Sequence, residues 1–225
     1  MDSSLNQQIY DRLKNDILTF ALKPGEPVSA QKLALRYDVS RTPAREALVR
    51  LQDEELVEIY PQSRSLIARI KSSKIREEWY IRRSLELGLV DLFFERMKPE
   101  HIERMKNCAK WMETLAGKER TPENSYEYLL SDDSFHQTAF EVSGQNLAFR
   151  LTAGMLPNYR RARILIDMDR ANEDRTLAGH RKLISYLEKK DKEGYRAFLE
   201  EHISNIKGDV LVMKERFPEM FEEED

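Results

Sequence analysis

The chain opens with a repeat of apolar and polar positions that is typical of a helix. Leu5, Ile9, Leu13 and Ile17 recur every four residues, so their side chains gather on one face of an amphipathic helix. Proline and glycine in the stretch KPGEP (23–27) predict a turn that ends this helix. The first element predicted is therefore a helix with one face directed at a core.

Two shorter helices are predicted next, joined by a tight connection. Ser29 is a suitable N-cap for the segment AQKLALRY. Asp38 and Val39 make the connection. In the following segment, SRTPAREALVRLQDEEL, Thr42 can cap a third helix and Pro43 fits its first helical position. This succession of two helices around a short turn is typical of a helix-turn-helix motif.

A β-hairpin is predicted behind the third helix. The runs LVEIY (56–60) and SLIARI (65–70) are rich in residues that favour strands, and PQSR joins them as a turn. Three short helices followed by a hairpin are the outline of a winged helix-turn-helix. We therefore predict a winged helix-turn-helix DNA-binding domain over residues 1–72.

The rest of the chain shows helical periodicity and no further strand pattern. The polar stretch KSSK (71–74) is a suitable domain boundary. We predict an all-α antiparallel bundle of about six helices over residues 75–216, followed by a solvated acidic tail at 217–225. The predicted helices span residues 75–97, 99–116, 122–142, 145–168, 173–189 and 191–214.

Charge is distributed unevenly over these two parts. The formal net charge of the whole chain is −3. Residues 1–74 carry 12 Lys and Arg against 10 Asp and Glu, which leaves 25 against 30 in the remainder. The N-terminal part can thus approach nucleic acid through a local basic face. A single cysteine excludes an internal disulfide framework, and there is neither an export pattern nor an apolar run that could span a bilayer, so we expect a soluble cytoplasmic protein without a membrane segment.

The start of the third predicted helix carries residues suited to DNA. In a helix-turn-helix, the N-terminal residues of the second helix contact base edges. Arg41 and Arg45 lie one turn apart there, and a guanidinium fits guanine O6 and N7 or a phosphate. The hydroxyls of Ser40 and Thr42 suit phosphates, and Arg64 lies at the hairpin tip. Two arginines alone could equally form a solvated helix face, but their place after a helix and a tight turn favours DNA binding.

This N-terminal part resembles the GntR family of bacterial transcription regulators. The resemblance rests on LKPGEPVS, on LALRYDVSRTPAREALVRLQDEELV and on the YPQ…I tail of the hairpin, over about residues 5–70. It implies that Arg41, Thr42 and Arg45 read or clamp operator DNA, with Ser40 at the start of the helix. The departures from the family pattern are Asp38 in place of a usual Gly, SRS in place of a wing Gly, and Gln31 where some members have Arg.

Three of the four histidines fall on inward faces of different predicted helices. His136 shares a face with Asp132 one turn before it, while His180 and His202 lie on the apolar stripes of two later helices; His101 is expected to be exposed. A single inward histidine is more often a core residue bonded to a carbonyl. Burying all four groups without partners is costly, and a divalent cation such as Zn, Ni, Mn or Fe would satisfy them together. Periodicity alone leaves both interpretations open.

A second resemblance concerns the C-terminal part. The stretch DDSFHQTAFEVSGQN and the two later histidines resemble the helical ligand-binding domain of FadR-type GntR regulators, over about residues 75–215. The metal-binding branch of these regulators uses an Asp and a His one turn apart plus two later His. The resemblance places these metal ligands on Asp132, His136, His180 and His202.

The first bundle helix offers a candidate contact for an effector. Arg82 and Glu86 form an i, i+4 pair on its inward stripe, which in isolation is an ordinary helix salt bridge. The resemblance implies that Arg82 is a pocket residue that holds an effector carboxylate. Arg160, Arg161 and Arg163 are expected mainly on a solvated or dimer-facing surface, with room for one of them to turn inward.

The function that these features predict is transcription regulation. A homodimer would bind near-palindromic double-stranded operator DNA, and a small carboxylate effector at the divalent metal would change its operator affinity. The alternative is a metal-dependent, hydrolase-like enzyme fused to a DNA-binding domain. For that alternative, Glu86 is the one candidate general base with a suitable inward position, and the regulator is therefore favoured over an enzyme.

Overall fold

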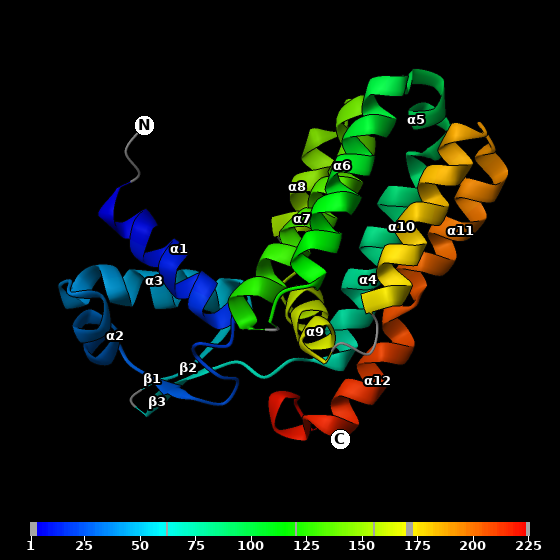
Figure 1. Cartoon of the computed structure of the whole chain (residues 1–225). Helices are drawn as coiled ribbons and strands as arrows, with labels where there is room; N and C mark the ends of the chain where they lie inside the picture. The colour runs from blue at the N-terminus through cyan, green and yellow to red at the C-terminus, as the bar shows by residue number, and fades with distance from the viewer. Residues whose placement is uncertain (1–3, 62, 120, 155, 170–172, 224–225) are drawn as a thin grey trace. The chain divides into compact units, whose positions relative to one another are not determined.

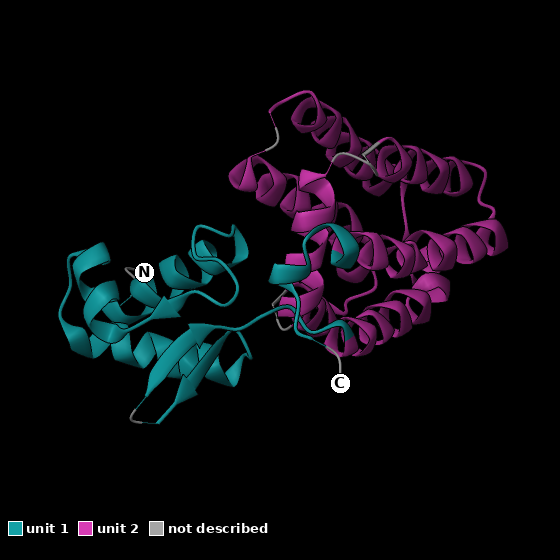
Figure 2. Cartoon of the chain, turned by 90° about the horizontal axis from the view of Figure 1, so that it is seen from below, with its two compact units in different colours: residues 1–72, 214–225 teal, residues 73–213 magenta. Residues whose placement is uncertain are grey.

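A computed structural model describes residues 4–61, 63–119, 121–154, 156–169 and 173–223. The chain divides into two compact units (Figure 2). The first unit comprises residues 1–72 together with 214–225, and the second unit comprises residues 73–213. The first unit is thus built from two separate segments of the chain.

Three helices of the first unit carry its apolar core. They are α1 (Leu5–Leu18), α2 (Ala30–Tyr37) and α3 (Arg41–Asp53). Ser29 caps α2 as predicted, its hydroxyl accepting a hydrogen bond from an amide in the first turn. Asp38 ends α2 with φ 54°, in the left-handed region that favours glycine. The tight connection predicted at this position is therefore made by an aspartate in a glycine-like conformation.

A three-stranded antiparallel sheet completes the winged helix-turn-helix (Figure 1). The predicted hairpin is formed by β2 (Val57–Tyr60) and β3 (Arg64–Ile67), with Val57 opposite Ile67. The third strand, β1 (Pro27–Val28), pairs with the other edge of β3. It has two residues, too few for a strand pattern to appear in the sequence.

The sequence predicts a solvated acidic tail at residues 217–225, and its described part, residues 217–223, is anchored at one buried residue. After a short turn at Pro218–Met220, Phe221 is only 2% exposed and forms a parallel bridge with Ile70. Ile70 makes backbone hydrogen bonds of 2.9 and 3.0 Å with the residues on either side of Phe221. One buried aromatic side chain and its backbone pairing thus hold this segment in place, while Glu219, Glu222 and Glu223 are exposed.

The described residues of the second unit fold into nine helices rather than about six. In Figure 1, α6 runs beside both α7 and α10. None of the described helices is both long and apolar enough to cross a membrane. The helices are α4 (Ser72–Gly88), α5 (Val90–Arg96), α6 (Pro99–Ala116), α7 (Pro122–Val142), α8 (Asn146–Gly154), α9 (Pro157–Met168), α10 (Glu173–Glu188), α11 (Lys192–Ser204) and α12 (Ile206–Arg216).

The extra helices arise because three of the predicted helices are interrupted. Pro157 begins α9, since its ring cannot continue the preceding helix, and Leu156 before it is held out of the helical region at ψ 64°. Leu89 and Asn205 interrupt two other helices but keep helical φ and ψ values. Among the described residues at these three interruptions, Leu156 is thus the one with dihedral angles outside the helical region.

The apolar core of the second unit lies among α5, α6, α7, α10 and α11. Phe135 of α7 belongs to this core and stacks on the ring of His180 at a centroid distance of 4.2 Å. Polar site residues are thus embedded in an apolar surrounding. Fully buried members of the core include Phe93, Met105, Phe135, Leu183 and Leu187.

Candidate functional site

The first unit presents the residues predicted to contact DNA on its surface. The side chains of Arg41 and Arg45 make no hydrogen bond or ion pair within the described part of the chain. Arg64, at the start of β3, lies over the ring of Tyr60 at 5.6 Å. Five exposed side chains form this candidate DNA surface: Ser40, Arg41, Thr42, Arg45 and Arg64.

The start of α3 differs from the prediction by two residues. Ser40, not Thr42, is the N-cap, and its hydroxyl makes no capping hydrogen bond. Pro43 is therefore the third helical residue, buried against the core together with Ala44. The sequence favoured Thr42 because proline is most common at the first helical position. The hydroxyls of Ser40 and Thr42 are both left exposed beside the free amides of the helix start.

The four predicted metal ligands converge in the second unit. Asp132 and His136 lie one turn apart on α7, His180 lies on α10 and His202 on α11. One potential ligand atom from each residue lies within 4.8 Å of the other three. Asp132, His136 and His180 are buried, and the His180 and His202 rings are 4.9 Å apart between centroids. Imidazole and carboxylate donors in this number suit a first-row divalent cation.

A carboxylate on α4 orients one of these imidazoles. Nδ1 of His136 lies 2.7 Å from Oε2 of Glu86, and both side chains are buried. A carboxylate in this position accepts a hydrogen bond from Nδ1–H and leaves Nε2 as the atom with a free lone pair. Nε2 of His136 is itself buried and has no hydrogen-bond partner among the described residues.

Both ring nitrogens of His180 are also buried without a hydrogen-bond partner among the described residues. Neither ring nitrogen makes a hydrogen bond within the described part of the chain, although Nε2 lies 3.2 Å from Oδ1 of Asp132. Leaving a buried polar group without a partner costs about 1–3 kcal/mol. A metal ion could bind one nitrogen of each ring. The unpartnered nitrogens of His136 and His180 are therefore consistent with a metal site.

The pKa shifts of Asp132, His180 and His202 also suit a metal ion. Burial raises the pKa of Asp132, but the Arg163 guanidinium and the nearby histidines lower it more strongly, so its pKa lies well below the ordinary value. Burial lowers the pKa of His180 and, together with the neighbouring imidazoles, holds the pKa of His202 well below the ordinary value. An ionised carboxylate and neutral imidazoles are the forms that bind metals.

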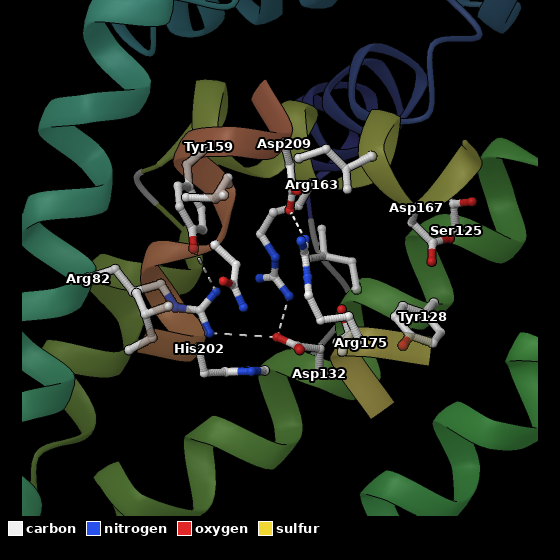
Figure 3. A pocket seen from close by; sticks show the side chains of 16 residues that line it. Arg82, Ser125, Tyr128, Asp132, Tyr159, Arg163, Asp167, Arg175, His202 and Asp209 are labelled. Carbon is white, nitrogen blue, oxygen red and sulfur yellow. Dashed lines mark hydrogen bonds and ion pairs between the residues drawn. The ribbon is translucent and has the colours of Figure 1, made fainter. Parts of the chain in front are cut away.

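A cavity of about 90 Å³ adjoins the candidate metal ligands (Figure 3). Roughly 10–15 Å³ on this scale accommodates one water molecule, so the cavity has room for a ligand of several heavy atoms. Asp132 and His202 line it together with Arg82. Its wall also includes Tyr159, Arg163, Arg175 and Asp209.

Arg82 lies in this cavity wall, as the resemblance implied. Its Nε donates to Oε1 of Glu86 at 2.6 Å, which confirms the i, i+4 pair. Its guanidinium also lies 3.6 Å from Asp132 and donates to the hydroxyl of Tyr159 at 3.5 Å. Burial alone would raise the pKa of Glu86, but Arg82 and His136 lower it to about 2. Arg82 and Glu86 therefore form a buried, ionised pair between the cavity and His136.

The arginines of α9 were misplaced by sequence analysis. Arg160 and Arg161 are buried rather than solvated, at 7% and 0% exposure. Arg163 donates to Asp132 and, at 3.0 Å, to Asp133, while Arg160 donates to Asp133 at 2.6 Å. Asp133 is not one of the four clustered residues. The sequence does contain two adjacent acidic residues on α7 and the basic segment RRAR on α9. Their opposite charges indicate a contact only once α7 and α9 are known to pack together.

Glu78 of α4 is a structural residue of the site that sequence analysis did not identify. Its carboxylate accepts hydrogen bonds from the backbone amides of Tyr159, at 2.6 Å, and Asn158, at 3.4 Å. Burial raises the pKa of Glu78, although these hydrogen bonds oppose the rise. Glu78 thus holds the first turn of α9, the helix that carries Tyr159 and Arg163 to the cavity.

Comparison with protein families identifies both parts of the chain. The model of the bacterial regulatory proteins of the gntR family matches residues 5–67, and the model of the FCD domain matches residues 79–205. The chain belongs to the GntR regulators with an FCD domain. The FCD match includes Arg82 and all four candidate metal ligands, whereas Phe221 lies outside both matches.

Relatives of this GntR regulator extend over nearly its whole length. The transcriptional repressor RspR of Escherichia coli K12 is 24% identical over 98% of this chain and 95% of its own length. An uncharacterised HTH-type transcriptional regulator of Streptomyces ambofaciens is 26% identical over 96% of this chain and 89% of its own. The structure of E. coli McbR/YncC has the same fold, with a TM-score of 0.74, 22% identity, and coverage of 96% of this chain and 100% of that one. The chain is therefore a bacterial transcription regulator with a ligand-binding FCD domain.

Proposed function

We propose that this regulator changes its affinity for operator DNA when a small organic acid binds at a divalent metal ion in the second unit. The observation that carries the proposal is the convergence of four potential ligand atoms within 4.8 Å beside a cavity. Buried imidazole nitrogens without partners among the described residues support it. A metal ion would satisfy one nitrogen of each imidazole, and the cavity would hold the acid.

The metal would be held by one carboxylate and three imidazoles. Zn, Ni, Mn and Fe all accept this donor set. When bound, such an ion supplies positive charge and open coordination positions that a carboxylate can fill. The proposed ligands are Asp132, His136, His180 and His202.

Arg82 would bind the carboxylate of the effector from the cavity wall. Its planar guanidinium has five N–H donors, and the described contacts to Glu86, Tyr159 and Asp132 leave it facing the cavity (Figure 3). Because Arg82 also pairs with Glu86, which orients His136, an acid that shares the donors of Arg82 would act on the metal ligand set as well. This connection makes Arg82 the proposed effector-binding residue.

The first unit would bind the operator through α3. Arg41 and Arg45 would contact bases or phosphates, Ser40 and Thr42 would contact phosphates, and Arg64 would contact the backbone or the minor groove. A homodimer would present two such helices to the half-sites of a near-palindromic operator. Because the operator lies on a bacterial chromosome, the proposed place of action is the cytoplasm.

Regulation requires that the acid bind two arrangements of the dimer unequally. An effector shifts an equilibrium only by its difference in affinity for the two states. The same coupling makes operator DNA change the affinity for the acid by an equal factor. The proposal therefore predicts reciprocal effects of acid and operator DNA.

The test combines metal analysis with two binding measurements. Elemental analysis of purified protein, loaded and then desalted, is expected to give about one equivalent of metal per chain. A thermal-shift screen of organic acids should show stabilisation that chelator abolishes, and anisotropy with labelled operator should show that the same acid changes DNA affinity. The proposal is wrong if loaded protein retains no metal, or if no acid that stabilises the protein alters DNA binding.

The alternative is a metal-dependent hydrolase, for which the described residues around the cluster offer no free base. Glu86 is the acidic residue closest to that role, but Arg82 and His136 engage its oxygens and lower its pKa to about 2. A carboxylate with so low a pKa is a weak proton acceptor. Metal-dependent turnover of carboxylate or phosphate esters that is lost in His180→Ala would favour the hydrolase over the regulator.

A further inference from the structure

Gly179 occupies an unusual position immediately before His180 in α10. It lies inside a helix and is buried, and glycine within a helix is destabilising relative to alanine. Its φ is not in the left-handed region, so backbone conformation does not require a glycine here. Another requirement must explain the missing side chain.

The ring of His202 fills the place where that side chain would be. A Cβ atom on Gly179 would lie 2.5 Å from Nδ1 and 3.0 Å from Cε1 of His202. Both distances are shorter than van der Waals contact, and the ring itself would have to move. On its other sides the imidazole faces His180 and His136, at 4.9 and 5.7 Å between centroids. A rotation away from α10 would carry its nitrogens out of the cluster.

We propose that Gly179 is a positioning residue for the metal centre. It removes the side chain that would stand between α10 and the imidazole of His202, so that the histidines of α10 and α11 reach one ion. This inference rests on the metal-dependent function proposed above. It goes beyond the ligand set, because Gly179 itself supplies no donor atom.

Gly208 provides a matched control in a neighbouring helix. It lies inside α12, and a Cβ added there would meet no atom within 4 Å. Gly208→Ala should therefore raise the melting temperature of the metal-free protein by about 2–4 °C through helix propensity alone, with metal affinity unchanged. Gly179→Ala has the same gain in propensity but displaces His202, so we expect metal affinity to fall at least tenfold.

A double-mutant cycle tests the steric cause without any metal. In chelator, Gly179→Ala should lower the melting temperature of the wild type, whereas in a His202→Ala background the same change should raise it. This sign reversal is expected because the three described atoms nearest to the added Cβ all belong to the imidazole of His202. If Gly179→Ala alone does not fold, recovery of a folded protein by adding His202→Ala supports the same conclusion.

The outcomes separate this inference from the proposed function. Equal metal affinity in Gly179→Ala and wild type, or equal temperature shifts in the two backgrounds, would overturn the positioning role while leaving the metal site intact. A wild type that binds no metal would overturn the proposed function and the positioning role with it. Reduced metal affinity in Gly208→Ala as well would show that the effect is not specific to Gly179 and would also overturn the inference.

Discussion

The polar site residues of the two units have opposite surroundings. In the first unit, Arg41 and Arg45 are exposed and make no side-chain bond among the described residues. In the second unit, Asp132, His136 and His180 are at most 4% exposed and crowd within reach of one another. An exposed arginine is solvated whether or not DNA is bound, whereas a buried imidazole needs a partner inside the protein. Changes at the first site should therefore affect binding alone, and changes at the second should affect binding and stability together.

The largest expected effect lies at the buried site. His180→Ala removes a central ligand, so metal affinity should fall by more than the ~10–100-fold typical for loss of an outer-shell partner. The fold should persist, because two unsatisfied ring nitrogens leave the core with the side chain. Metal content and circular dichroism measure the two parts of this prediction. His101→Ala is the control, since His101 lies outside the cluster and should leave metal content unchanged; stoichiometric metal in His180→Ala would contradict the assignment.

The next largest effect concerns the stability of the first unit and its dependence on one buried side chain. Phe221→Ala should destabilise the first unit by about 3–5 kcal/mol, as is usual for a buried phenylalanine, because Phe221 is 2% exposed and pairs with Ile70. The partly exposed Phe217 is the control and should cost clearly less on conversion to alanine. Amide hydrogen exchange in β2 and β3 under increasing denaturant measures the change. Equal losses for the two variants would show that the C-terminal segment is not part of the unit.

A smaller effect is expected at the exposed site. Arg45→Ala should weaken operator binding by about 1–3 kcal/mol and reduce its salt dependence, while leaving stability unchanged because the side chain has no described partner. Arg36→Ala is a suitable control, because Arg36 lies on α2 and pairs with Asp16 of α1. Fluorescence anisotropy over a series of salt concentrations separates the two variants. Operator binding that is unaffected by Arg45→Ala would remove α3 from the DNA interface.

The smallest effect concerns backbone strain in the first unit. Asp38→Gly should stabilise the protein by up to about 1 kcal/mol, because glycine adopts the left-handed conformation at φ 54° without a steric cost. Asp53→Gly, inside the last turn of α3, should destabilise by about the same amount. Urea unfolding of both variants checks the opposite signs. A loss of stability in Asp38→Gly would mean that the aspartate side chain contributes more than its backbone costs.

The same contrast explains how much the sequence could predict. The first unit was predictable because its signals are local: Ser29 caps α2, and the SRTPAREAL segment forms α3. Periodicity placed each of the four candidate metal ligands on an inward face of its helix, and the resemblance to FadR-type regulators joined them into one set. The structure brings one potential ligand atom of each within 4.8 Å of the others, and their role in metal binding stays a prediction.

The features that sequence analysis missed all depend on distant partners. Arg163 was expected at the surface because its partners, Asp132 and Asp133, lie about 30 residues earlier on another helix. The role of Gly179 depends on a ring 23 residues later in the chain. Phe221 pairs with Ile70, and residues 73–213 separate the two in the sequence. Periodicity reports which face of an element is apolar, but not which residue of another element will meet it.

The split composition of the first unit has a consequence for how the protein is made. A chain leaves the ribosome from its N-terminus, and domains generally fold as they emerge. Phe221, which completes the first unit by pairing with Ile70, is synthesised only after residues 73–213. The DNA-binding fold of a nascent chain therefore stays unfinished until the whole sensory unit has been translated. A truncated product that ends within the second unit would have the α3 arginines but not the complete fold that supports them.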